Sequence, residues 1–245
     1  MTMDRRTVLG MGGAVAAGVL LAPGVQLIAA PPSNETSAAG SQRWAMLVDV
    51  NKCTPGCTAC LDACRKENNV PLFGDPARDV HWIRKVEVQD KEHRRAPFTL
   101  PVLCNHCENP PCVHVCPTLA SFIRKDGIVL IDEHRCIGCR YCMIACPYKA
   151  RSLVYFSTRF PKDGNPRVPI RAKGVVEKCT FCVHRVDDGQ LPACVETCQG
   201  SGQGAMIFGD INDPQSEIAQ RVKTLRTETI RADLGLKPHV HYQGL

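Results

Sequence analysis

The stretch that decides the fold reads Cys136-Ile-Gly-Cys139-Arg-Tyr-Cys142-Met-Ile-Ala-Cys146-Pro147. Two residues separate each of its first three cysteines, and the fourth follows after three more residues and precedes a proline. Three thiols on so short a loop can face one common centre, whereas the fourth points away toward a neighbouring centre. Proline suits the first position of a helix, so we expect a helix to begin after Cys146. The spacing is typical of ligands to a [4Fe-4S] cluster.

Three further groups of four cysteines are variants of this plan, and the four groups account for all sixteen cysteines of the 245-residue chain. Every group ends with two cysteines separated by three residues, whereas the earlier gaps differ. The groups are, in chain order, Cys53, Cys57, Cys60 and Cys64; Cys104, Cys107, Cys112 and Cys116; Cys136, Cys139, Cys142 and Cys146; and Cys179, Cys182, Cys194 and Cys198. Four occurrences favour iron–sulfur ligation over the alternatives, a disulfide scaffold or zinc ribbons.

The complete cysteine set also defines the kind of cluster. No ligand position is substituted, so we expect four [4Fe-4S] clusters and no [3Fe-4S] cluster. No CxxC pair is followed by histidine, so a c-type haem is not predicted. Because no cysteine is missing, His106, His114, His134 and His184 are interpreted as hydrogen-bonding loop residues rather than as ligands.

The amino-terminal residues have the pattern of an export signal. Arg5 and Arg6 precede residues 8–30, an uncharged run rich in alanine, glycine, valine and leucine. The paired arginines predict export by the twin-arginine route, with a plain secretory signal as the alternative. The run is long enough to span a bilayer, so an uncleaved anchor is also possible. We therefore expect a periplasmic location, at the outer face of the cytoplasmic membrane.

Composition excludes several classes of protein. An apolar fraction of 44% excludes a wholly disordered chain, and a mean hydropathy of −0.13 excludes a polytopic membrane protein. The formal charge of +6 does not indicate nucleic-acid binding, since four bound clusters would add about −8. The basic residues near the cysteines either raise cluster potentials or face solvent; they are Arg65, Lys66, Arg140, Lys149 and Arg151.

Short strands and turns are expected between the cysteine groups. Asp126-Gly127 lies between two apolar segments, 121–123 and 128–131, and predicts a hairpin. Further strands are expected over residues 44–50, 80–88, 153–156 and 205–208. A helix is expected over residues 218–234, and residues 237–245 are interpreted as an extended arm. Docking of this arm on a partner is left as a hypothesis to test by deletion.

The chain resembles the four-cluster iron–sulfur subunits of the molybdopterin-oxidoreductase and polysulfide-reductase type, a family that includes electron-transfer subunits of dimethyl sulfoxide reductase and nitrite reductase (NrfC). The resemblance spans residues 44–214. It is carried by Cys104-Asn-His-Cys-Glu-Asn-Pro-Pro-Cys112, Cys136-Ile-Gly-Cys-Arg-Tyr-Cys142, Lys178-Cys-Thr-Phe-Cys182, Pro192-Ala-Cys-Val-Glu196 and Phe208-Gly-Asp-Ile-Asn-Asp-Pro214. Gln199 departs from the family, which has proline there, and this puts a helix start in doubt without removing a ligand.

Within this family, the arginine pair and the segment Gly56-Cys-Thr-Ala-Cys60 with Cys64-Arg-Lys-Glu-Asn-Asn-Val-Pro71 most resemble the DsrO type. Proteins of that type are exported subunits of the DsrMKJOP membrane complex of sulfur metabolism. The resemblance implies partners for this chain: an NrfD-type integral membrane subunit that interacts with quinone, a multihaem cytochrome c and a heterodisulfide-reductase-like iron–sulfur subunit. It also implies that the chain meets membranes through these partners.

The resemblance further implies crossed ligation, in which each cluster takes three cysteines of one group and the last cysteine of another. The implied sets are Cys53, Cys57, Cys60 and Cys198 (cluster 1); Cys179, Cys182, Cys194 and Cys64 (cluster 2); Cys104, Cys107, Cys112 and Cys146 (cluster 3); and Cys136, Cys139, Cys142 and Cys116 (cluster 4). The last thiol of each run points out of its own loop, which agrees with this crossing.

The expected fold class is α+β, with two interleaved bacterial-type 2[4Fe-4S] ferredoxin-like units, inserted loops and strands, and a C-terminal arm. The expected division is residues 1–30, signal or anchor; 31–43, linker; 44–66 with 175–212, outer unit of cysteine groups one and four; 67–96, insertion; 97–157, inner unit of groups two and three; 158–174, connecting loop; and 213–245, C-terminal helix and arm.

The sequence contains no catalytic constellation: neither a paired acid and base, nor a nucleophile triad, nor a nucleotide loop. We therefore expect a non-enzymatic electron-transfer subunit that relays electrons between the membrane subunit and its haem or iron–sulfur partners. The alternative function is the electron-transfer beta subunit of a molybdopterin-dependent reductase.

Overall fold

Strand β1 (Trp44–Asp49) is the centre of a four-stranded sheet with the order β8-β1-β10-β9. It runs antiparallel to β8 (Met206–Asp210) and parallel to β10 (Val240–Gln243). The sequence of β1 is almost continuously apolar because both of its faces are buried. Ala45 and Leu47 pack with Ile218 of α7 (Glu217–Thr224), whereas the alternate residues face the main core, which contains many cysteines.

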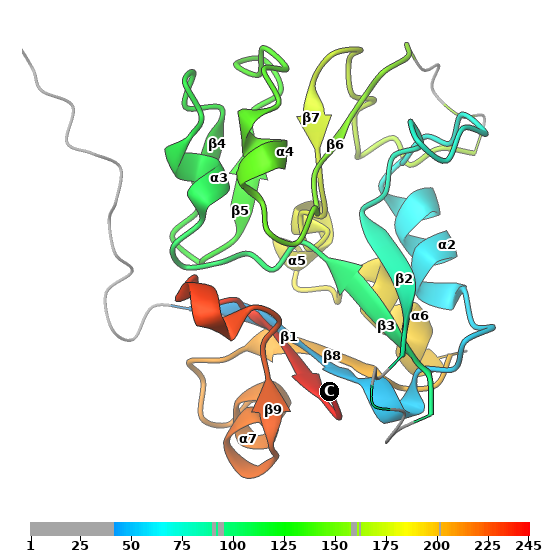
Figure 1. Ribbon diagram of the computed structural model, residues 1–245, viewed down its shortest axis with the longest axis vertical. Helices are drawn as coiled ribbons and strands as arrows, with labels where there is room; N and C mark the ends of the chain where they lie inside the picture. Colours follow the sequence, from blue (N-terminus) through cyan, green and yellow to red (C-terminus); the bar gives the residue numbers. More distant parts are fainter. Residues whose placement is uncertain (1–41, 90–91, 93–95, 158–160, 162, 201) are drawn as a thin grey trace, which may run out of the picture. The chain divides into compact units, whose positions relative to one another are not determined.

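The computed structural model describes residues 42–89, 92, 96–157, 161, 163–200 and 202–245. The predicted signal (residues 1–30) and nearly all of the predicted linker lie outside these residues. Among the residues that are described, no helix is both long and apolar enough to cross a membrane. Short helices alternate with small sheets (Figure 1), which confirms the α+β class.

The C-terminal segment forms part of the core sheet. Val240 and Tyr242 are fully buried in β10, and the Tyr242 hydroxyl donates to the Pro101 carbonyl at 3.0 Å. Residues 240–243 alternate apolar and polar side chains, a pattern that fits a strand between β1 and β9 (Thr227–Glu228). The interpretation of residues 237–245 as a docking arm is therefore wrong for its strand portion, which is an interior element.

The helix expected over residues 218–234 is also too long. Helix α7 begins at the Ser216 cap, whose hydroxyl accepts from Ala219 N at 3.2 Å, and it ends at Thr224. Beyond it, β9 pairs with β10, and a short 3-10 turn, η2 (Ala232–Leu234), follows. The backbone donors of β9 are used by the sheet, so the helix cannot continue through it.

Three two-stranded sheets complete the β structure. The predicted hairpin is present as β4 (Ser121–Ile123) and β5 (Val129–Ile131), with Gly127 at φ +84° in its turn. Strand β2 (Ile83–Val88) pairs with β3 (Phe98–Leu103), and β6 (Ser152–Leu153) pairs with β7 (Val176–Glu177). Strands β3 and β7 were not predicted, and β6 ends before the expected residues 154–156.

Two pairs of helices carry six of the sixteen cysteines. Helix α2 (Ala59–Glu67) packs on α6 (Ala193–Gly200), and α3 (Pro111–His114) packs on α4 (Tyr141–Ala145). Figure 1 shows the first pair in cyan and gold, and the second pair in green. Helix α5 (Val183–Val186) and the 3-10 turn η1 (Val50–Lys52) are each less than two turns long. The helix expected after Cys146 is absent: Lys149 N donates to Cys146 O at 3.1 Å, so Pro147 lies in a turn.

Candidate metal centres

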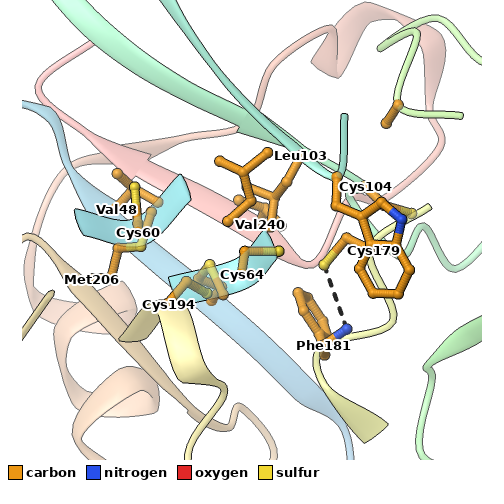
Figure 2. Close-up of a cluster of buried hydrophobic side chains, with 14 of the residues drawn as sticks. Val48, Cys60, Cys64, Leu103, Cys104, Cys179, Phe181, Cys194, Met206 and Val240 are labelled. Atoms are coloured by element: carbon orange, nitrogen blue, oxygen red, sulfur yellow. Dashed lines mark hydrogen bonds between the residues drawn. The ribbon is translucent and has the colours of Figure 1, made fainter. Parts of the chain in front are cut away.

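Helices α2 and α6 each carry two cysteines one turn apart. Cys60 and Cys64 lie on α2, and Cys194 and Cys198 lie on α6. Residues four apart lie on the same face of a helix, so each helix presents both of its thiols to the other. Figure 2 shows Cys60, Cys64 and Cys194 together in the buried core, with Cys104 and Cys179 beside them.

Three hollows are each lined by four cysteines, and each has about 310 to 320 Å³ of space between atoms. The fourth set is recognised by electrostatics: burial raises the pKa of Cys64, and charge on the other three thiols of its set raises it further. We number these sets as sites 1 to 4: Cys53, Cys57, Cys60 and Cys198; Cys64, Cys179, Cys182 and Cys194; Cys104, Cys107, Cys112 and Cys146; and Cys116, Cys136, Cys139 and Cys142.

The structure gathers the sixteen cysteines into four sets of four, and the binding of one cluster by each set stays a prediction. Three thiols of each site come from one cysteine group and the remaining thiol comes from a different group. In the described part of the chain, no three His, Cys, Asp or Glu side chains converge closely enough for a single metal ion. The sulfur atoms of sites 1, 3 and 4 instead surround a hollow.

The four sites follow one another in a fixed order. Helix α2 joins site 1 to site 2 through Cys60 and Cys64. Sites 2 and 3 meet at Cys179 and Cys104. Burial raises the pKa of the Cys179 thiol, and charge on the neighbouring Cys104 is the next largest cause, so that this pKa reaches about 12. Arg151 joins site 3 to site 4, since it donates to Cys112 Sγ at 2.9 Å and is also the strongest charge acting on the Cys142 thiol.

Exposure of the thiols differs along this order. All eight cysteines of sites 2 and 3 are buried. Half-buried cysteines occur only at the two ends of the series: Cys53 and Cys57 at site 1, and Cys116, Cys136 and Cys139 at site 4. Solvent and other proteins can therefore approach the series at its ends.

The thiols are suited to bind metal rather than to stay ionised alone. All sixteen are free of disulfide bonds. Burial raises the pKa of Cys60 to about 11 and that of Cys107 to about 12, so these thiols are protonated at neutral pH until a cation displaces the proton. Backbone N–H groups point at several sulfur atoms, including Ala205 N at 3.3 Å from Cys198 Sγ and Val176 N at 3.4 Å from Cys136 Sγ.

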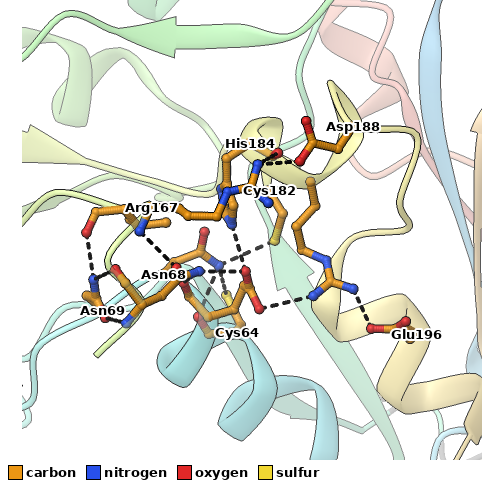
Figure 3. A network of polar contacts seen from close by, with 12 residues as sticks. Cys64, Asn68, Asn69, Arg167, Cys182, His184, Asp188 and Glu196 are labelled. Atoms are coloured by element: carbon orange, nitrogen blue, oxygen red, sulfur yellow. Dashed lines mark hydrogen bonds and ion pairs between the residues drawn. The ribbon is translucent and has the colours of Figure 1, made fainter. Parts of the chain in front are cut away.

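Asn68 is a polar contact of site 2 that the sequence analysis missed. Its Nδ2 lies 3.0 Å from Cys64 O, 3.4 Å from Cys182 Sγ and 3.8 Å from Cys64 Sγ. Figure 3 shows the amide between the two cysteines. The available signal was its position at the end of α2, four residues after Cys64.

An ion-pair network encloses the same site. Glu67 accepts from the His184 ring at 2.7 Å and from Arg185 Nη1 at 3.1 Å, and Arg185 also pairs with Glu196 (Figure 3). His184 therefore makes the hydrogen-bonding contact expected of it. His106 does the same at site 3, where its Nδ1 accepts from Val129 N at 3.0 Å.

Only one of the five basic residues named from the sequence is buried at a site. Arg151 is 4% exposed, whereas Lys66, Arg140 and Lys149 are exposed and Arg65 is half-buried. Two further cations were missed. Lys85 is half-buried, lines site 1 and donates to Thr54 O at 2.9 Å, and Lys178 is 2% exposed beside Cys179.

These buried cations provide a test of whether the sites fit an anionic group. In the described chain, neither Arg151 nor Lys178 forms an ion pair with a carboxylate, and Arg151 Nε has no hydrogen-bond partner. Leaving a buried charge without a counter-ion is costly. A [4Fe-4S] core held by four thiolates carries net negative charge, so the donor set and the cations both fit it.

The fold and these sites define a class, the ferredoxin-like iron–sulfur proteins, and comparison with known proteins agrees. The family model of the 4Fe-4S dicluster domain matches residues 96–159 and 167–211. The chain belongs to the family of iron–sulfur electron-transfer subunits of larger oxidoreductase complexes. It binds four [4Fe-4S] clusters and is not itself the catalytic subunit.

Three relatives illustrate the family. Iron–sulfur subunit 1 of the Hdr-like menaquinol oxidoreductase of Archaeoglobus fulgidus is 46% identical over 99% of this chain and 98% of its own length. A tetrathionate reductase subunit of Salmonella typhimurium is 39% identical over 100% of this chain and 90% of its own. The cluster-binding subunit of the menaquinone reductase of Nitratidesulfovibrio vulgaris is 36% identical over 82% and 88%.

Proposed function

We propose that sites 1 to 4 each bind one [4Fe-4S] cluster in the crossed sets described above. We further propose that the chain relays electrons between an NrfD-type, quinone-interacting membrane subunit and haem or iron–sulfur partners. A bound cluster supplies a one-electron carrier. The observation that carries the proposal is the serial order of the sites, with half-buried thiols only at the two ends.

The residues around the middle sites keep water away from them. Site 2 is enclosed by the Glu67 network, and His106 stacks on Phe181 with 3.8 Å between ring centroids, close to sites 2 and 3. Charges in a dry interior interact more strongly than charges in water. The protein therefore holds the two middle sites in fixed surroundings and leaves exchange with partners to the ends.

Site 4 supports one of these exchanges because exposed apolar side chains surround it. Ile144, on helix α4, is 82% exposed, and Tyr141 of the same helix and Leu119 and Ile137 of the adjoining loops are each more than half exposed. Clustered exposed apolar residues mark contact surfaces for other proteins. We propose that the membrane subunit docks on this surface.

We propose that the complex is of the DsrMKJOP-like, sulfite-reduction-associated type. The Archaeoglobus relative supports this assignment, since its name combines an Hdr-like protein with menaquinol oxidation and it matches nearly the whole chain. In this proposal the partners are the NrfD-type subunit, a multihaem cytochrome c and a heterodisulfide-reductase-like subunit. The chain itself is of the DsrO type.

The alternative function, the beta subunit of a molybdopterin-dependent reductase, has its own support. The tetrathionate reductase relative also matches the whole of this chain, although at lower identity. Both functions use the same series of clusters and differ only in the partner at one end. The partners therefore distinguish the two functions.

The test is purification of the tagged full-length chain from native membranes in a mild detergent, followed by mass spectrometry of its partners. The DsrO-type proposal predicts an NrfD-type subunit, a multihaem cytochrome and a heterodisulfide-reductase-like subunit. A large molybdopterin subunit would contradict it and establish the alternative.

We also propose export by the twin-arginine route to the outer face of the membrane. The double variant Arg5→Lys with Arg6→Lys retains the charge of the signal but lacks its arginine pair. We expect the loaded protein to accumulate in the cytoplasmic fraction, whereas the unaltered chain is found with the periplasmic face. Unchanged export of the double variant would contradict this route.

A further inference from the structure

Arg151 lies at the junction of sites 3 and 4. Its Nη2 donates to Cys112 Sγ at 2.9 Å, and its Nη1 donates to Ser121 Oγ at 2.7 Å. Cys112 lines the hollow of site 3, whereas Ser121 lines the hollow of site 4 together with Cys142. One buried guanidinium thus faces a thiol of site 3 and a thiol of site 4.

Lys178 occupies the equivalent place between sites 2 and 3. Its Nζ donates to Cys179 O at 2.8 Å and also to Val129 O, which holds the ammonium group between the loop that carries Cys179 and strand β5. Val129, whose carbonyl accepts from Lys178, lines the hollow of site 3 together with Cys104 and Cys112. The thiols that act on Lys178 are Cys179 of site 2 with Cys104 and Cys112 of site 3.

These two cations differ from the buried arginine nearby. Arg171 is equally buried, but its Nε pairs with Glu177, which neutralises it. For Arg151 and Lys178, the described residues supply no carboxylate partner, and the anions facing them are cysteine thiolates. Their positive charge therefore acts on the group that these thiolates bind. In a buried environment this charge is screened only weakly.

Site 3 is the one site that faces both buried cations. Site 2 faces Lys178, and site 4 faces Arg151. Site 1 has Lys85, which is only half-buried and therefore screened by solvent. Reduction of a cluster adds one negative charge, and a nearby positive charge stabilises the reduced form, which raises the reduction potential.

We propose that Arg151 and Lys178 together give site 3 the highest reduction potential of the four sites, so that it holds the electron at rest within the series. This inference depends on the ligand sets proposed above. An electron entering at either end would then settle at site 3, and the buried neighbouring sites would separate it from solvent.

The test is a redox titration of the purified, cluster-loaded full chain, followed by electron paramagnetic resonance. Four midpoint potentials are compared in the unaltered chain, in Arg151→Gln and in Lys178→Met. Each variant should lower two midpoints. The midpoint potential that falls in both variants should be the highest of the unaltered chain. In each variant it should fall by at least about 59 mV, which corresponds to a tenfold change in the equilibrium constant of a one-electron reduction.

Arg140→Gln is the matched control. Arg140 adjoins the ligand Cys139 and lines the hollow of site 4, but it is exposed and solvent screens its charge, so its removal should shift no midpoint as far. Arg151→Lys keeps the charge and should restore much of the potential lost in Arg151→Gln. A purely structural role for Arg151 would not produce this rescue.

Several outcomes would overturn the inference. They are unchanged midpoints in both variants, shifts no larger than those of Arg140→Gln, or a doubly affected midpoint that is not the highest. If Arg151→Gln loses iron, Lys178→Met still tests the claim, because this variant alone should lower the highest midpoint potential. A chain that binds fewer than four clusters before any substitution would contradict the proposed function instead.

Discussion

Cys60 and Cys64 lie one turn apart on the same face of α2, yet they belong to different sites: Cys60 lines the hollow of site 1 and Cys64 lies among the thiols of site 2. Cys198 and Cys194 of α6 repeat this arrangement in the reverse order along the chain. Each helix therefore contributes one thiol to each site. Neither site is complete without both helices, although more than one hundred residues separate them in the sequence.

Asn68→Ala should lower the potential of site 2. Asn68 Nδ2 donates to Cys182 Sγ at 3.4 Å, and hydrogen bonds to cluster sulfur ligands raise the reduction potential. We expect one of the four midpoints to fall in a redox titration followed by electron paramagnetic resonance, while the iron content stays unchanged.

The adjacent residue provides the control for Asn68. Asn69 is also buried, but its Nδ2 donates to the carbonyls of Val168 and Asn165, at 2.6 and 2.9 Å, and to no thiol. Asn69→Ala should therefore cost about 1–3 kcal/mol of stability and leave every midpoint in place. Equal effects of the two variants on the midpoints would contradict a direct role of Asn68.

Tyr242→Phe should destabilise the folded chain by about 1 kcal/mol, because it removes the hydroxyl that donates to Pro101 O from a buried strand. Tyr242→Ala should cost about 3–5 kcal/mol, since it also leaves a cavity beside β1. Thermal unfolding of the loaded chain under anaerobic conditions measures both effects. A Tyr242→Ala variant as stable as the unaltered chain would show that β10 is dispensable and would restore the interpretation as a docking arm.

Stability should fall as the pH decreases below about 6.5, and His239 should contribute to this fall. Burial, followed by the charge of Arg43, whose Nη1 lies 3.2 Å from the ring, lowers the pKa of His239 to about 4. Between the ordinary pKa of 6.5 and this value, the unfolded chain binds a proton that the folded chain does not. The contribution is present in full above pH 6.5 and is lost at about 1.4 kcal/mol per pH unit below it.

His239→Gln should therefore flatten the pH dependence. We expect the difference in the free energy of unfolding between pH 7.5 and 5.5 to shrink by about 1 kcal/mol. The same slope in His239→Gln and in the unaltered chain would show that His239 does not make this contribution.

Ile144→Asp should weaken binding of the membrane subunit without loss of clusters, since it places a charge in the apolar surface beside site 4. Leu72→Asp is the matched control, because Leu72 is also exposed, at 52%, but lies away from the loops of site 4. Recovery of the membrane subunit in the detergent purification is the measurement. Equal recovery with both variants would exclude this surface as the contact.

The sequence predicted the parts of the fold that local chemistry determines. Asp126-Gly127 indicated the hairpin because the turn needs the positive φ that Gly127 adopts. Strand β3 was missed because it contains Pro101, which a strand tolerates only where its absent N–H is not needed. The hypothesis of a docking arm was wrong because the residues around Val240 and Tyr242 do not by themselves show whether an extended segment lies inside a sheet or outside it. The pairing with β1, far away in the sequence, decides this.

The same limit applies to the sites. Cysteine spacing identified all sixteen residues that line them, because the spacing itself encodes the loop geometry. Lys178 and Asn68 could not be identified from spacing, since long-range packing places them against sulfur atoms. Arg151 was one of five basic residues near cysteines, and only its burial distinguishes it from Arg140 and Lys149.

The central claim is the crossed assignment of sixteen cysteines to four clusters, and native mass spectrometry of the loaded full chain tests it most directly. We expect the mass of four [4Fe-4S] clusters in the unaltered chain. Cys64→Ser and Cys194→Ser should each lose one cluster, and their double variant should still lose only one. The double variant Cys60→Ser with Cys64→Ser should lose two. Loss of two clusters from the first double variant, or of one from the second, would contradict the account.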